Sequence, residues 1–224
     1  MSLFVLCLKW GTKYNDDYVR RLAGGVARNL TLDHEFICLT DREVRGINCA
    51  ALPSNLPGWW AKIGLFRPDI LDGDKLYLDL DVVVTGSLDS LVPRQPTTKV
   101  WALDDFSYSL RVPKVDIDPE TKSLLGGIGT CNSSIMYWQN EFGSDVWDKF
   151  QTETMKRLHG DQNWITQCLW PHSLELYPAE IASSYKYDWL AQHRHRGSVM
   201  VFHGDPKPHD LDTLDPFRKL WEQA

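Results

Sequence analysis

The stretch Leu76-Tyr77-Leu78-Asp79-Leu80-Asp81-Val82-Val83-Val84 decides the fold class of this 224-residue chain. Its apolar residues predict a buried strand, and in strand geometry the two carboxylates project on one side while Leu80 projects on the other. Desolvating two carboxylates is costly unless a cation or hydrogen-bond donors neutralise them. A hard divalent ion that also binds substrate phosphates is a common solution, so we interpret Asp79 and Asp81 as candidate metal ligands. The alternative is a pair that caps a turn or pairs with a nearby arginine.

Apolar runs and helical periodicities alternate on both sides of this stretch. Strands are predicted over residues 3–8, 35–40, 47–51, 75–84, 99–103, 133–138 and 198–202. Helices are predicted over residues 59–66, 144–158 and 161–169, and over a segment that Asn15 or Asp16 caps and that has apolar residues at positions 18, 22, 26 and 30. No internal repeat or linker interrupts the pattern. The sequence therefore predicts an α/β fold in a single domain, residues 1–224, with a mostly parallel central sheet flanked by helices.

The composition excludes several classes of protein. The chain is 43% hydrophobic and 24% charged, which is ordinary for a soluble globular protein and unlike collagen, disordered chains or disulfide scaffolds. Its net charge of −6 and its lack of a Lys/Arg run argue against nucleic acid as a partner. Five widely spaced cysteines without a CxxC pair favour a reducing compartment, so we expect a cytoplasmic protein. No stretch has the length of a secretory signal or a membrane span, so no transmembrane segment is expected.

A second candidate segment covers residues 199–208, where a predicted strand delivers His203 into a loop that contains Gly204 and Lys207. An imidazole at a strand end can complete an oxygen-rich metal site and favours Mn²⁺ over Mg²⁺. Lys207 is then a candidate phosphate ligand. The alternative is that His203 is a hydrogen-bonded structural residue, which is the commoner role of a single histidine.

Together the two segments resemble the metal-dependent sugar-nucleotide transferases of glycosyltransferase family 8, which includes glycogenin and bacterial galactosyl- and glucosyltransferases. The landmarks that carry this resemblance span most of the chain: Asn15-Asp16-Asp17-Tyr18, Lys62, Asp79-Leu80-Asp81, Cys131-Asn132-Ser133-Ser134, Gly160-Asp161-Gln162, and Phe202-His203-Gly204 through Lys207-Pro208. Several features depart from the family, among them Ser134, which stands where the family usually has glycine. His203 directly precedes Gly204, whereas the family histidine stands two residues further before its glycine, and His209 follows Lys207-Pro208 where the family has an aromatic residue.

The resemblance implies a GT-A fold, which is Rossmann-like, and a metal-dependent hexosyltransferase. Such an enzyme moves a hexose from a UDP-sugar, with retention of configuration, to a hydroxyl of a glycan or another acceptor. Peripheral membrane association, found in the family, stays open. The implied donor-binding residues are Asn15, Tyr18 (stacked on the uracil), Lys62, Asp79, Asn132, Gly204 and Lys207. The implied ligands of Mn²⁺ or Mg²⁺ are Asp79, Asp81 and His203, and the residues placed nearest the anomeric carbon are Asp161 and Gln162.

Several of these residues also have structural interpretations. Asp161 stands where an N-cap of helix 161–169 would stand, Tyr18 falls on the apolar face of the first helix, and Asn132 could satisfy backbone groups at a strand entrance. Trp59 and Trp60 are candidates for an acceptor platform, although large aromatic side chains fill cores more often than they bind ligands. The basic cluster of residues 193–196 could add charge near a diphosphate or form a solvated loop.

Two other functions stay open. The run of residues 77–83 also satisfies the DxDxV signature of haloacid-dehalogenase phosphatases, in which Asp79 would be the nucleophile. In that fold the signature opens the domain, whereas here 78 residues precede it, and Asp104-Asp105 follow too soon to be the second acidic pair. A non-catalytic sugar-nucleotide-binding module is the other alternative, since a fold does not establish activity. The sequence does not specify the donor sugar, the acceptor, the linkage or the oligomeric state.

Overall fold

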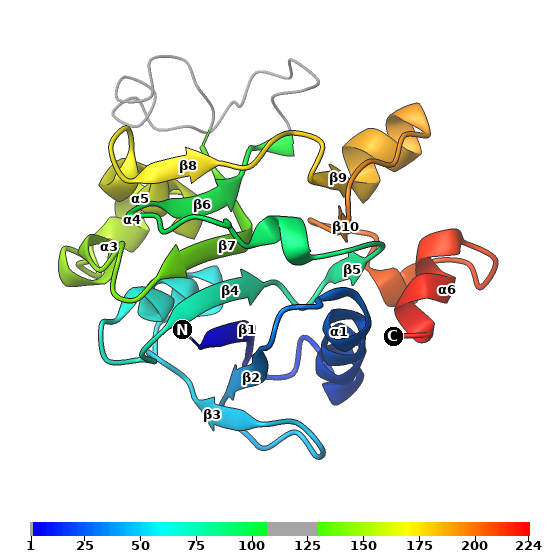
Figure 1. Cartoon of the computed structure of the whole chain (residues 1–224), viewed down its shortest axis with the longest axis horizontal. Helices are drawn as coiled ribbons and strands as arrows, with labels where there is room; N and C mark the ends of the chain where they lie inside the picture. Colours follow the sequence, from blue (N-terminus) through cyan, green and yellow to red (C-terminus); the bar gives the residue numbers. More distant parts are fainter. Residues whose placement is uncertain (1, 107–129) are drawn as a thin grey trace.

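The computed structural model describes residues 2–106 and 130–224. Seven strands of these residues form a large sheet in the spatial order β3-β2-β1-β4-β7-β6-β8 (Figure 1). They are β1 (Leu3–Lys9), β2 (Glu35–Thr40), β3 (Cys49–Ala51), β4 (Asp74–Leu78), β6 (Val100–Leu103), β7 (Asn132–Gln139) and β8 (Leu174–Leu176). Strand β7 is antiparallel to both of its neighbours, and the other pairs are parallel. The predicted α/β fold with a mostly parallel central sheet is confirmed.

The expectation of one continuous strand over residues 75–84 is wrong. The last pair of the ladder is Leu78 with Ile135, and one further bond, from the Asp79 amide to the Ser134 carbonyl at 2.8 Å, extends it. The chain then turns, with the Val82 amide donating to the Asp79 carbonyl at 3.3 Å. The chain continues as β5 (Val82–Val84) in a separate sheet with β10 (Val199–Val201) and β9 (Ala182–Ser184). The two carboxylates therefore occupy the turn between two sheets, where lysine side chains can reach them.

Helices cover both faces of the large sheet. Alternate side chains of β1 point to opposite faces of this sheet. Leu3, Val5 and Cys7 belong to the apolar cluster on one face, and Leu6 and Leu8 belong to the cluster on the other. The first cluster includes α1 (Asp16–Asn29), the small sheet and α6 (Pro216–Glu222). The second includes the 3₁₀ helix η1 (Gly58–Phe66), α3 (Asp145–Asp148) and α5 (Asp161–Leu169). The remaining helical turns are η2 (Asp89–Leu91), α4 (Thr154–Arg157), the π-helical turn η4 (Tyr185–Leu190) and η5 (Pro208–Asp210).

The segment predicted as one helix over residues 144–158 forms two short helices, α3 and α4. Between them the ring of Phe150 packs on Trp60 and Trp164, with ring centroids 5.6 and 5.8 Å away. Phe150 is partly buried by these contacts and directly follows Lys149, the C-cap of α3. In the described residues no helix is long and apolar enough to cross a membrane.

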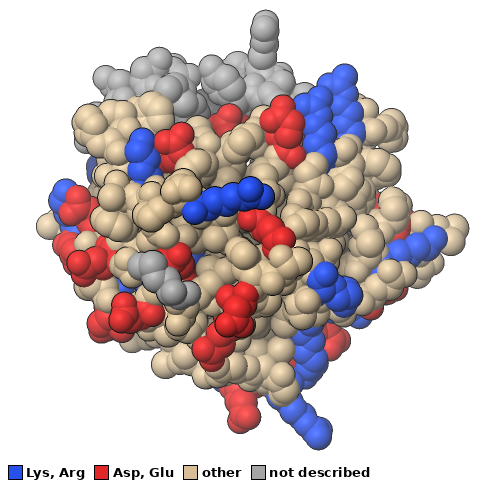
Figure 2. All heavy atoms as spheres, in the orientation of Figure 1, with Lys and Arg blue, Asp and Glu red and all other residues tan. Residues whose placement is uncertain are grey.

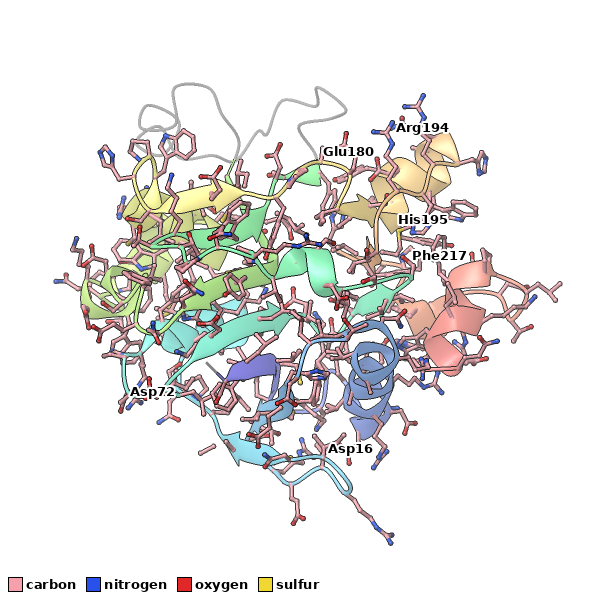
Figure 3. All side chains as sticks on the ribbon, viewed as in Figure 1. Asp16, Asp72, Glu180, Arg194, His195 and Phe217 are labelled. Carbon is pink, nitrogen blue, oxygen red and sulfur yellow. The ribbon has the colours of Figure 1, made fainter. Side chains whose placement is uncertain are left out.

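Charges on the face shown in Figure 2 are interspersed, and Lys and Arg form no continuous stripe on it. The basic cluster lies in the loop before β10, where the ring of His195 packs edge-on against Phe217 at 5.3 Å and Arg194 points away from the fold (Figure 3). Residues 193–196 are all exposed, as the interpretation of this cluster as a solvated loop expects.

Candidate active site

A cavity of about 680 Å³ opens where β4 ends and β7 begins. This is the edge at which ligands bind in open α/β sheets, beyond the carboxyl ends of the parallel strands. The small sheet lies beside the same end of β4 (Figure 1). Of the residues that the sequence singles out, the cavity is lined by Lys62, Asp79, Asp81, Asn132, Asp161, Gln162 and His203.

Lys62 joins two carboxylates on one wall of the cavity. Its ammonium lies 2.8 Å from Oδ1 of Asp79 and 3.9 Å from Oδ2 of Asp161, and it donates to the Ser133 hydroxyl at 3.1 Å. The Tyr77 hydroxyl donates to Asp79 Oδ1 at 2.6 Å. Burial alone lowers the pKa of Lys62, but the adjacent Asp79 and Asp161 carboxylates more than offset it, so the pKa lies above its ordinary value. The lysine is therefore a fixed positive charge in the cavity wall.

Asp81 has a second lysine as its partner. Lys207, which follows β10, places its ammonium 2.5 Å from Asp81 Oδ2, and the Tyr14 hydroxyl donates to the same oxygen at 2.8 Å. Burial, followed by the neighbouring charge of Asp79, raises the pKa of Asp81 despite the Lys207 ammonium. Burial and Asp81 likewise raise the pKa of Tyr14, which keeps its proton for this hydrogen bond. The alternative of an arginine partner for the two aspartates is wrong, because both partners are lysines.

Asp161 and Gln162 face the start of β7. The Ser133 hydroxyl donates to Asp161 Oδ2 at 2.6 Å, and the Ser133 amide donates to Gln162 Oε1 at 3.1 Å. Asp161 is not the N-cap of its helix, since Gly160 holds that position and Asp161 is the first helical residue. Its side chain is free to turn into the cavity wall because the helix start does not use it. Burial raises the pKa of Asp161, and Lys62 only partly offsets this effect.

Asn132 and His203 occupy other parts of the wall. The Asn132 side chain accepts a hydrogen bond from the Ser134 amide at 3.0 Å, which is the strand-entrance role that its alternative interpretation expects. His203 Nε2 lies 2.6 Å from the Ser184 hydroxyl, and its ring stacks on Phe106 with centroids 5.6 Å apart. Among residues 2–106 and 130–224, no three His, Cys, Asp or Glu side chains gather into a group that could hold a metal ion. The ligand role of His203 stays a prediction.

Four residues that the sequence singles out do not line this cavity: Asn15, Tyr18, Gly204 and Lys207. Lys207 still reaches it through Asp81. Asn15 caps α1 by accepting from the Asp17 amide at 3.1 Å, and it lines a neighbouring hollow of about 440 Å³. Tyr18 is 3% exposed and packs against Tyr14 in the core, as its alternative interpretation expects. Gly204 is exposed.

Two further residues position this site: Tyr14, which sequence reasoning missed, and Ser133, which it included in a landmark of the resemblance without a role of its own. Ser133 binds both Asp161 and Gln162, and Tyr14 binds Asp81. Tyr14 had a usable signal, because it lies in the loop that follows the first strand, and such loops border ligand sites in open α/β sheets. The signal for Ser133 was the landmark of residues 131–134, which did not distinguish its role from that of its neighbours.

No protein-family model matches the chain. No curated protein matches its sequence. Solved structures do match its fold. An active-site mutant of LgtC gives a TM-score of 0.71 at 16% identity, covering 98% of this chain and 94% of that one. The galactosyltransferase LgtC in complex with donor and acceptor sugar analogs gives a TM-score of 0.67 at 16% identity, and the match covers 98% of this chain and 95% of that one. The glycosyltransferase GlyE of Streptococcus pneumoniae TIGR4 gives a TM-score of 0.65 at 14% identity, and the match covers 98% of this chain and 60% of that one. The chain therefore has the Rossmann-like GT-A fold of these structures.

Proposed function

We propose that this chain is a glycosyltransferase that moves a hexose from a UDP-sugar to a hydroxyl of a glycan or another acceptor. The observation that carries the proposal is the pair of lysine–carboxylate contacts, Lys62 with Asp79 and Lys207 with Asp81, on one cavity at the carboxyl end of β4. The fold that the chain shares with glycosyltransferases supports it. The proposal covers residues 1–224 as one catalytic domain and keeps the cytoplasmic setting that the cysteines predict.

The chemistry needs positive charge where these lysines lie. Transfer breaks the bond between the anomeric carbon and a diphosphate oxygen, which keeps the electron pair, and forms a bond from that carbon to the acceptor oxygen. The acceptor hydroxyl gives its proton to water, and the nucleoside diphosphate leaves as an anion. Preorganised cations stabilise the charge that builds on the leaving oxygen. We assign this role to Lys207 and Lys62, and we expect the reaction to retain the anomeric configuration.

Asp161 and Gln162 serve the transferred sugar in this proposal. Both side chains line the cavity beside Lys62, and Ser133 holds both of them. A carboxylate in this place can accept hydrogen bonds from sugar hydroxyls, and the Gln162 amide can stabilise the transition state near the anomeric carbon. Because α5 and β7 fix these groups before substrate arrives, little reorganisation is needed during the reaction.

A divalent ion, Mn²⁺ or Mg²⁺, belongs to the proposal through the chemistry of the donor set. Asp79 and Asp81 offer carboxylate oxygens, which such ions prefer, and His203 lines the same cavity. The raised pKa of Asp81 indicates that one lysine does not fully offset burial and the charge of Asp79. In the proposal Asp79 and Asp81 would hold the ion and His203 would be its third ligand, although in the described residues these three side chains do not form a group that could hold a metal. When bound, the ion acts as a Lewis acid toward the diphosphate.

Thermal unfolding with UDP, GDP, ADP or CDP, each with Mn²⁺, Mg²⁺ or chelator, tests the proposal. A ligand at about 100 times its dissociation constant stabilises by about 2.7 kcal/mol, which gives a clear shift in Tm. We expect UDP with Mn²⁺ to stabilise the wild type and not Asp79→Asn. The matched control is Asp145→Asn, because Asp145 is an exposed carboxylate that pairs with Lys149 away from the cavity.

The same preparation separates the alternatives. Release of UDP from a UDP-sugar together with a glycosylated acceptor supports the transferase. Absence of any response to the nucleotides contradicts it. Hydrolysis of an aryl phosphate supports the phosphatase with Asp79 as nucleophile, and nucleotide binding without donor cleavage supports the non-catalytic module.

A further inference from the structure

Trp59 stands at the rim of the cavity with 55% of its surface exposed, and among the described large apolar side chains only Leu214 is more exposed. Its neighbour Trp60 is 7% exposed and packs against Phe150 in the core. The same segment thus sends one indole into the core and the other to the cavity. Core filling explains Trp60 and does not explain Trp59, because an exposed indole gains little from the hydrophobic effect.

The helix η1 places this indole in line with the lysine of the site. In a 3₁₀ helix, side chains three residues apart lie one above the other, so Trp59 and Lys62 share one side of η1. At a rise of about 2.0 Å per residue their backbones are about 6 Å apart along the axis. Both residues line the cavity. Trp59 therefore lies at the rim and Lys62 lies deeper, against Asp79.

The segment of residues 159–161 lies against η1 and has the same order, with an aromatic ring followed by a charged residue. The ring of His159 lies 6.2 Å from that of Trp59 at an interplanar angle of 27°, and both residues line the cavity. The indole edge approaches Gly160 so closely that a Cβ there would lie 3.2 Å from Trp59 Nε1. Asp161 follows at once and lies 3.9 Å from Lys62. Residues 59–62 and 159–162 thus form an aromatic pair at the rim and an ion pair below it.

We propose that Trp59, backed by His159, is a platform on which a pyranose ring of a saccharide acceptor stacks. The inference rests on the proposed function and names the acceptor class of that site. The apolar C–H face of a pyranose packs well on an aromatic ring, while its hydroxyls need polar partners. Asp161 and Gln162, the residues assigned to the transferred sugar, follow Gly160, which the indole of Trp59 approaches. An acceptor hydroxyl held there faces the residues assigned to the transferred sugar.

The platform serves the acceptor rather than the nucleobase because of where the two lysines lie. Lys207, the proposed diphosphate ligand, pairs with Asp81 beside Tyr14. Trp59 lies instead beside Gly160 and thus near Asp161, a residue assigned to the transferred sugar at the far end of the donor. Along the cavity, the donor therefore extends from the sugar site toward Lys207, and the space next to Trp59 is left for the second substrate.

The test compares Trp59→Ala, Trp59→Tyr and, as matched control, Phe142→Ala. Phe142 is also an exposed aromatic residue, but it follows β7 at the opposite edge of the sheet and does not line the cavity. Lactose, maltose and cellobiose are the acceptor probes. Initial rates give the KM of each saccharide and of the UDP-sugar, thermal shift with UDP and Mn²⁺ reports donor binding, and saturation-transfer NMR reports saccharide binding directly.

Trp59→Ala is expected to raise the acceptor KM at least tenfold while the donor KM and the UDP shift stay unchanged. The acceptor KM of Trp59→Tyr, which keeps an aromatic face, should stay within about threefold of the wild-type value. The acceptor KM of Phe142→Ala should equal that of the wild type. An unchanged acceptor KM in Trp59→Ala overturns the platform, and a parallel rise of donor KM assigns Trp59 to the nucleotide and overturns it as well.

If UDP gives no shift in the wild type, the proposed function fails, and the NMR signals alone then decide on the platform. Loss of the saccharide signals in Trp59→Ala, with retention in Phe142→Ala, supports the platform. Equal signals in wild type and Trp59→Ala overturn it, as does the absence of signals from all three saccharides in the wild type.

Discussion

Asp161 is a carboxylate that the protein buries to 4% exposure. Burial raises its pKa above the ordinary value, and Lys62 and Ser133 only partly offset this effect. Because the folded-state pKa is above the unfolded one, the folded protein binds more protons in the pH window between them. The contribution of Asp161 to the free energy of unfolding therefore falls as pH rises through that window, which begins near the ordinary pKa of an aspartate.

Replacement of Asp161 by asparagine separates stability from function. The variant keeps an acceptor for Ser133 and leaves Lys62 paired with Asp79. We expect its stability relative to wild type to increase as pH rises from 4 to 7, and its transfer rate to fall on the order of 100-fold. Urea unfolding across this pH range and initial transfer rates measure both effects. A stability difference that does not change with pH would contradict the assignment.

The contact between Asp81 and Lys207 makes these residues energetically coupled. In a buried ion pair, removal of one partner leaves the other charge uncompensated, so single variants lose more stability than the pair itself contributes. We expect a coupling of about 1–3 kcal/mol between Asp81→Asn and Lys207→Met in a double-mutant cycle. Urea unfolding of wild type, both single variants and the double variant measures it. Additivity within about 0.5 kcal/mol would show that the contact contributes no coupling.

At the scale of elements, the small sheet depends on a tight connection before β10. Gly197 has φ +71°, and a Cβ there would lie 2.1 Å from the Ile181 carbonyl oxygen. Gly197→Ala therefore combines a left-handed backbone, which costs about 1–3 kcal/mol, with a backbone clash. The control is Gly46→Ala, at φ +83° with no atom within 4 Å of a Cβ. We expect the urea midpoint of Gly197→Ala to fall well below that of Gly46→Ala, and equal midpoints would contradict the clash.

Elements with an apolar pattern of their own could be predicted from the sequence, including the short strands β3 and β10 within the predicted ranges 47–51 and 198–202, whereas elements without such a pattern could not. The strands over residues 35–40 and 133–138 and the helix over 161–169 agree with β2, β7 and α5 within two residues, because each has a long apolar pattern. The three-residue strands β8 and β9 have no such pattern, since neighbouring strands rather than their own residues define them. Helix α6 was missed despite a readable start, Asp215 as N-cap followed by Pro216.

The site could be predicted in its residue types but not in its pairings. The spacing of the two aspartates indicated Asp79 and Asp81, the family resemblance implied Asp161 and Gln162, and all four line one cavity. The sequence did not show that lysines 17 and 126 positions away from the two aspartates would pair with them. These contacts depend on the break between β4 and β5, which follows from tertiary packing and has no local signal of its own.

At the scale of the whole molecule, the site joins the two sheets. Asp79 follows the last strand residue of β4, and its lysine comes from η1 on the large-sheet side. Asp81 precedes β5, and its lysine comes from the loop after β10 on the small-sheet side. A ligand that contacts both lysines would therefore connect the small sheet to the large one.

Hydrogen exchange with and without UDP and Mn²⁺ tests this connection. We expect slower exchange in residues 58–62 and 203–207, and also in β10, because a bound ligand stabilises the state in which both sheets are docked. Residues 139–145 and the segment near Asp72, at the opposite edge of the large sheet, should not change (Figure 3). Protection confined to residues 58–62 would show that the ligand engages only the Lys62 side. Protection of β10 without change at 139–145 would show that the two lysines act on one ligand across the junction of the sheets.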